Sequence, residues 1–69
     1  MANKTKQIQE QLRRLVSEAV ENKIYNPKRV LEYIIDNGWG EADPHRATIE
    51  KLLKQNGVDY VYGFWDKVK

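Results

Sequence analysis

Apolar residues recur at helical spacing through the first third of the chain, from Thr5 to Asn22. They form one stripe on a helix of 3.6 residues per turn and therefore predict a first helix over this range. The stripe consists of Ile8, Leu12, Leu15, Val16, Ala19 and Val20. Part of it also fits a coiled-coil seam between two copies, but it covers only about two heptads, where three or four are typical. An ordinary core face is therefore favoured over a homodimer seam.

A second helix is predicted to begin at Asn26-Pro27. Asparagine is a favoured N-cap, and the fixed φ of proline suits the first helical position. The apolar stripe that follows consists of Val30, Leu31, Ile34 and Ile35. Gly38 supplies a left-handed stop, and Trp39 is placed to cover the last turn, as in a Schellman motif.

Similar signals predict a third helix over residues 44–56. Asp43 is the expected N-cap and Pro44 the first helical residue. The stripe consists of Ile49, Leu52 and Leu53, with Val58 placed to cover Leu53 beyond the stop at Gly57. Only a short link, Gly38 to Asp43, then separates the second and third helices.

Beyond the third helix the pattern becomes that of strands. The segment VDYVYGFWDKV is rich in β-branched and aromatic residues, with Gly63 as its turn former. It predicts two short strands over residues 59–62 and 64–68. A hairpin alone is not stable in water, so it either packs on the helices or pairs with the β-prone Ile24-Tyr25.

The length and composition limit the classes of protein. With 69 residues, the chain is expected to form one domain, residues 1–69, with a small core. A core of this size often gains from a second copy, so a homodimer is one expectation. The chain has no cysteine and one histidine, His45, which excludes a disulfide framework and favours a cytoplasmic location. The N-terminal residues predict neither a signal peptide nor a membrane span.

Charge and catalytic motifs add little. The net charge is +2, from 12 basic and 10 acidic residues spread along the chain, whereas nucleic-acid-binding proteins usually concentrate basic residues on one face. There is no cysteine nucleophile, no glycine-rich phosphate loop and no triad or metal context for the histidine. The carboxylates of Asp36, Glu41 and Asp43 lack the spacing of an EF-hand. We therefore expect neither an enzyme nor a cofactor.

The predicted order is helix, extended link, helix, tight turn, helix and hairpin, which is the order of a winged helix-turn-helix domain. Ile24-Tyr25-Asn26 enters the second helix, Gly38-Trp39 ends it, and HRATIEKLLKQNGVDYV runs from His45 to Val61. Over residues 24–61 the chain resembles the DNA-binding domain of bacterial arginine repressors, whose recognition helix has the form T-Q-A-T-V-S-R-D-I-K-E-L-G-L-V-K-V. The resemblance implies a mainly α fold, a three-helix winged helix-turn-helix with a short C-terminal β-hairpin. It also implies that the third helix enters the major groove.

By the same resemblance, Arg46, Thr48 and Lys51 occupy the positions of the family's glutamine, threonine and arginine and would contact DNA. Two features depart from the family. Glu50 replaces a serine, which would bring a carboxylate near the duplex, and the hairpin is shorter than a full wing. The family's arginine-binding, hexamer-forming domain has no counterpart in these residues, so neither that ligand nor the hexamer is expected.

Further cations are candidate DNA contacts. Lys28 and Arg29 fall in the first turn of the second helix, where backbone donors and positive charge together hold phosphates. Lys54 lies outside the apolar stripe of the third helix, and His45 precedes that helix. The alternative is that these side chains form an ordinary solvated surface.

Four aromatic residues, Tyr60, Tyr62, Phe64 and Trp65, lie close together near the C-terminus. Alternation along a strand predicts that Tyr60 and Tyr62 share a face. Part of the aromatic surface is then core, and the rest is available as a protein interface, a role in which Tyr and Trp are enriched.

Two functions are compatible with the sequence. The leading hypothesis is a small DNA-binding regulator, a dimeric repressor or excisionase-like factor whose partner is double-stranded DNA. The alternative is an inhibitor or adaptor of phage or mobile-element type, which would bind a host protein through the C-terminal aromatics.

Overall fold

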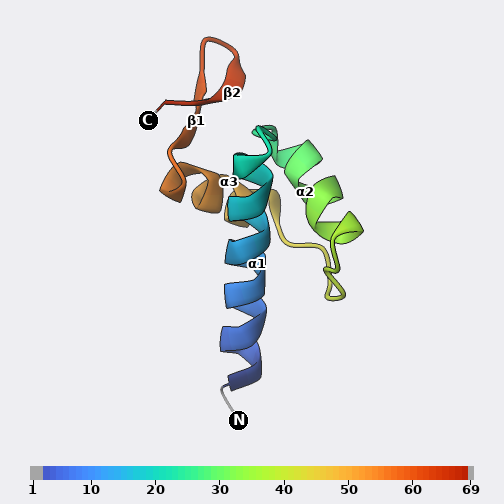
Figure 1. Cartoon of the computed structure of the whole chain (residues 1–69). Coiled ribbons are helices and arrows are strands. Elements are labelled where there is room, and N and C mark those ends of the chain that lie inside the picture. Colours follow the sequence, from blue (N-terminus) through green and yellow to red (C-terminus); the bar gives the residue numbers. More distant parts are fainter. Residues whose placement is uncertain (1–2, 69) are drawn as a thin grey trace.

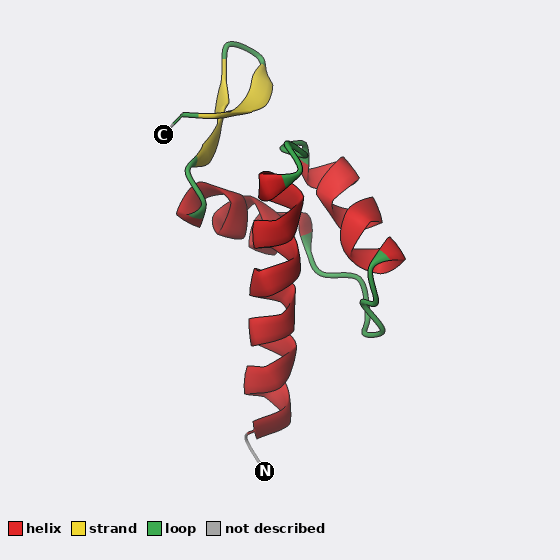
Figure 2. Ribbon diagram, in the orientation of Figure 1, coloured by secondary structure: helices red, strands yellow, loops and turns green. Residues whose placement is uncertain are grey.

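The computed structural model describes residues 3–68 of the chain, and the side chains of residues 5–68. Within this range, three helices precede an antiparallel two-stranded hairpin, so the mainly α architecture is confirmed (Figure 1; Figure 2). The elements are α1 (Asn3–Glu21), α2 (Pro27–Asp36), α3 (Arg46–Gln55), β1 (Val58–Val61) and β2 (Phe64–Lys67).

One hydrophobic core joins the three helices to the base of the hairpin. The apolar stripe of α1 is buried there, with Val16 and Ala19 at 0% exposure. Ile34 of α2, Leu53 of α3 and Val58 of β1 close over it and are equally buried. The stripe of α1 is thus a core face, as predicted. The first turns of α1 project past the other helices (Figure 1).

The end of α1 is marked by a left-handed residue that is not glycine. Lys23 has a φ of 63°. Its N–H donates to the Val20 carbonyl at 2.9 Å, and the N–H of Ile24 donates to the Ala19 carbonyl at 2.9 Å. This is the Schellman pattern, in which glycine is usual because a Cβ is strained at positive φ.

α2 begins and ends where the sequence predicts. The side-chain oxygen of Asn26 accepts the N–H of Lys28 at 2.9 Å, and proline is the first helical residue. At the other end, Gly38 has a φ of 107° and the N–H of Trp39 donates to the Ile34 carbonyl at 2.9 Å. Trp39 is buried against the core, so the predicted Schellman cap is confirmed.

The predicted start of α3 is wrong. Pro44 lies before the helix, which begins at Arg46 with His45 as its N-cap. Asp43 is therefore not the cap, and the helix does not cover residues 44–56. The link between α2 and α3 spans residues 37–45, so the predicted tight turn is wrong as well.

Tertiary contacts explain why this link remains a loop. The indole Nε1 of Trp39 donates to the Ala42 carbonyl at 3.1 Å, which ties the loop to a side chain buried in the core. Pro44 is half-buried beside the start of α2. The helical bonds of α3 then begin at the carbonyl of His45, which accepts the N–H of Ile49 at 3.2 Å.

α3 ends as predicted. Gly57 follows it with a φ of 80°, and its N–H donates to the Lys54 carbonyl at 3.1 Å. The chain then enters the hairpin, in which Val58 pairs with Lys67 and Val61 with Phe64.

The hairpin turn consists of Tyr62 and Gly63, with φ values of 53° and 86°. Two positive φ values are what a type I′ turn requires. The predicted strand over residues 59–62 is therefore wrong in including Tyr62. Within the described residues the sheet contains only β1 and β2, so the hairpin packs on the helices and does not pair with Ile24-Tyr25.

Candidate nucleic-acid interface

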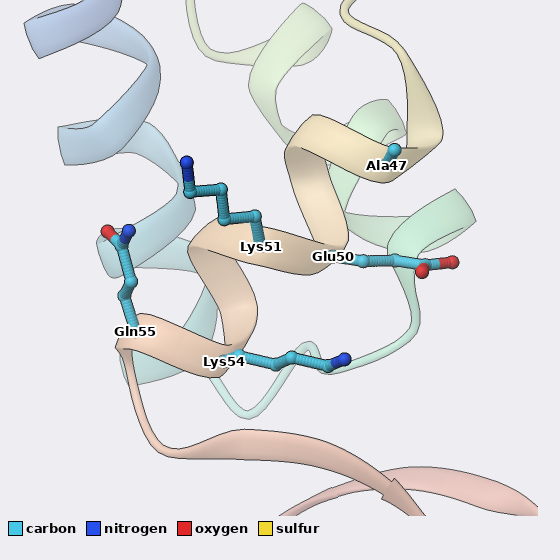
Figure 3. Close-up of a pocket in the computed structure, with 5 residues that line it drawn as sticks. All are labelled: Ala47, Glu50, Lys51, Lys54 and Gln55. Carbon is cyan, nitrogen blue, oxygen red and sulfur yellow. The ribbon is translucent and has the colours of Figure 1, made fainter.

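The exposed side of α3 carries a cluster of polar side chains (Figure 3). Ile49 and Leu53 turn into the core, so the opposite side of the helix faces solvent. A shallow hollow on that side, which we call the α3 face, is lined by Ala47, Glu50, Lys51, Lys54 and Gln55. Both lysines are exposed, and neither forms an ion pair with any side chain in residues 5–68. Figure 3 shows Glu50 and Gln55 directed to opposite sides of the helix.

Glu50, the carboxylate of α3, is already paired. The Nε of Arg46 donates to its Oε2 at 2.8 Å. Because this pair is neutral overall, the net charge of the α3 face comes from Lys51 and Lys54. Arg46 is thus engaged within the helix, and it lines a different pocket, between α2 and α3. His45 is exposed at the helix start, and its side chain makes no capping bond.

Thr48 lies at the side of the α3 face that borders α1. It lines a groove between the two helices together with Lys51 of α3 and Gln9 and Arg13 of α1. Arg13 is exposed, and sequence reasoning missed it as a candidate contact because only the fold brings it beside α3. The sequence showed only that Arg13 lies one helical turn from Gln9, so that the two share a side of their helix. It did not show that this side borders α3.

The structure separates Lys28 from Arg29, which the sequence predicted as a single phosphate site. Lys28 lines the pocket between α2 and α3 together with Arg46. Arg29 lines a hollow on another part of the surface, beside Lys23 and Trp65. The two cations in the first turn of α2 therefore belong to different surfaces.

The hairpin aromatics divide between core and surface. Trp65 is half-buried and packs against the core, with its ring edge-to-face against Tyr60 at a centroid distance of 5.7 Å. Tyr60 and Phe64 are 57% and 54% exposed, and Tyr62 is 96% exposed. Because Tyr62 lies in the turn, the prediction that it shares a strand face with Tyr60 is wrong. Trp65 thus belongs to the core, whereas the other three present their rings to solvent.

No protein-family model, curated protein or solved structure matches the chain. Across residues 3–68, no helix combines the length and the apolar character needed to cross a membrane.

Proposed function

We propose that the chain is a small DNA-binding regulator that places α3 in the major groove of duplex DNA. The observation that carries this proposal is the α3 face, where Lys51 and Lys54 are exposed while the one carboxylate of the helix is held by Arg46. α3 has 10 residues and is therefore about 15 Å long, at 1.5 Å per residue. The major groove is about 12 Å wide and admits the diameter of a helix, which is about 10–12 Å with its side chains.

We also propose that the fold is a winged helix-turn-helix. Three helices followed by a hairpin support it, as does the position of β1 directly after α3. The link over residues 37–45 is longer than the three or four residues typical of a helix-turn-helix. The proposal therefore depends on how α3 is presented to DNA and not on the turn.

The side chains of the α3 face have different roles in this arrangement. Lys51 and Lys54 neutralise phosphates or donate to guanine, whereas the amide of Gln55 matches the edge of adenine. Thr48 and Arg13 line the groove beside α1, where they contact the DNA backbone and fix the position of the protein. With a net charge of only +2, binding should be modest and strongest at low salt.

Fluorescence anisotropy with a labelled random-sequence duplex tests the proposal. Lys51→Gln and Lys54→Gln should each weaken binding, and removing one phosphate-binding charge should reduce the slope of log K against log salt by about 0.9. Lys23→Gln is the matched control, because it removes the same charge from an exposed position that lines the hollow beside Arg29 and Trp65, apart from the α3 face. If Lys23→Gln weakens duplex binding equally, net charge alone accounts for the binding. If the unchanged chain does not bind duplex at low salt, the proposed function is wrong.

A further inference from the structure

The turn of the hairpin places a bulky residue in a strained conformation. Tyr62 has a φ of 53° in the first position of a two-residue turn. Asparagine, aspartate or glycine is usual there, because bulky residues are strained at positive φ. With its side chain 96% exposed, Tyr62 gains almost no packing within the chain to offset this strain. Such an outlier points to a role outside the fold.

Two further exposed aromatic residues lie near Tyr62. More than half of Tyr60 and of Phe64 is open to solvent. Their pairing with Trp65 and Val61 places them on opposite faces of the hairpin, with Tyr62 at the tip. We call Tyr60, Tyr62 and Phe64 the aromatic knob. Figure 1 shows that the hairpin carrying them projects away from the helices, so the knob is free to enter a pocket on another molecule.

Two carboxylates protect the edges of the same hairpin. Asp59 and Asp66 stand directly opposite each other in β1 and β2. Each accepts the N–H of the residue that follows it, Tyr60 at 2.7 Å and Lys67 at 2.8 Å. These amides are therefore not free to pair with an additional strand. The side chains of the knob and the two negative charges are the other features that the hairpin presents to a partner.

The same chain has a pocket of complementary character between α2 and α3. Its volume is about 210 Å³, its walls are Pro27, Leu31, Pro44 and Ile49, and the exposed cations at its rim are Lys28 and Arg46. An apolar cavity of about 150 Å³ is already large enough to bind benzene, so an aromatic ring fits a pocket of this size. Because Arg46 is paired with Glu50, the net positive charge of the rim comes from Lys28, whereas the hairpin carries two carboxylates.

We propose that the aromatic knob of one copy of the chain inserts into this pocket of a second copy. Tyr62 enters the pocket, and the two carboxylates of the hairpin face the rim, where Lys28 forms no ion pair with the side chains of residues 5–68. This complementarity favours a second copy over DNA, whose phosphates would be repelled by the carboxylates. Reciprocal insertion uses each knob and each pocket once, so the assembly closes at two copies. The residues involved lie outside the α3 face, so the inference does not depend on DNA binding.

Sedimentation velocity across the micromolar range tests the proposal. The unchanged chain should associate reversibly from an 8.1 kDa monomer. Tyr62→Asn removes the ring at the tip of the knob and supplies a residue suited to the turn, so the chain remains folded while association should weaken by at least about tenfold. Ile35→Ser is the control, because it removes a side chain that is 45% exposed on α2 and does not line the pocket. It should leave association unchanged.

Introduced cysteines test which surfaces meet, because the chain has none of its own. A mixture of Lys28→Cys and Phe64→Cys should form a mixed disulfide under mild oxidation faster than either variant pairs with itself. Glu10→Cys, at an exposed position on α1, should not pair with Phe64→Cys. A monomer throughout the range, or association that survives Tyr62→Asn, would overturn the proposal. A monomer whose duplex binding is lost in Tyr62→Asn would also overturn it, with DNA as the occupant.

Discussion

The indole Nε1 of Trp39 donates to the carbonyl of Ala42 at 3.1 Å, so one buried side chain joins the core to the link that leads into α3. Trp39→Phe keeps an aromatic ring but removes this donor. It should lower the free energy of unfolding by about 1 kcal/mol or more, because a hydrogen bond is lost and the cavity is filled less well. Urea denaturation followed by circular dichroism measures the change.

Trp65 provides the matched comparison. Its Nε1 is also buried but has no hydrogen-bond partner among the described residues. Trp65→Phe removes an unsatisfied donor, so it should destabilise clearly less than Trp39→Phe. If the free energy of unfolding falls equally in the two variants, the bond to Ala42 contributes nothing to stability.

A comparison of alanine substitutions at Gly38 and Gly40 distinguishes backbone strain from steric contact. A Cβ at either position would meet no heavy atom within 4 Å, but only Gly38 has a positive φ, of 107°. We expect Gly38→Ala to destabilise by roughly 1 kcal/mol, and Gly40→Ala to be neutral or stabilising by about 0.4–1 kcal/mol. Thermal melts of the two variants provide the measurement, and similar shifts in both would contradict the left-handed cap.

Lys23 occupies a left-handed position where glycine is preferred, with a φ of 63°. The conformation costs a residue with a Cβ roughly 1–2 kcal/mol, partly offset by the greater freedom of glycine in the unfolded chain. Lys23→Gly should therefore raise the melting temperature. Lys23→Ala retains the strain while removing the charge, and a rise of the same size in that variant would attribute the effect to charge.

The ion pair on α3 gives opposite predictions for its two partners. Glu50→Gln frees the guanidinium of Arg46 and removes a carboxylate beside the α3 face, so duplex binding should tighten and its salt dependence should steepen. Arg46→Gln leaves Glu50 unpaired, and binding should weaken. The anisotropy assay measures both. Weaker duplex binding in Glu50→Gln would indicate that the carboxylate itself contacts the DNA, as an acceptor for the amino group of cytosine.

Signals between neighbouring residues placed three of the six helix ends. Asn26-Pro27 starts α2, and Gly38 and Gly57 end α2 and α3, because a capping side chain or a positive φ acts on the residues beside it. The end of α1 could not be read in this way, since Lys23 adopts the left-handed conformation without the usual glycine. The apolar stripes also identified the buried faces, because helical periodicity alone separates one face from the other. The prediction was wrong for Ile35 of α2, which is 45% exposed.

Two local predictions failed for different reasons. Asp43-Pro44 resembles Asn26-Pro27 as a start signal, but the bond from Trp39 to the loop and the packing of Pro44 beside α2 delay the helix. In the hairpin, Tyr62 is of a residue type that favours strands, but it lies in the turn. The pairing of Val61 with Phe64 leaves only two residues to reverse the chain.

The candidate site also has features that follow from the sequence and features that follow only from the tertiary structure. The sequence by itself determined that Lys51 and Lys54 lie opposite the buried stripe of α3, because residues on one helix have a fixed angular relation. Only the tertiary structure decided that Arg13 lies beside Thr48 and that the side chains of Lys28 and Arg29 line separate surfaces. Contacts between residues distant in sequence depend on how α1, α2 and α3 bury their apolar faces together, and no local preference specifies that packing.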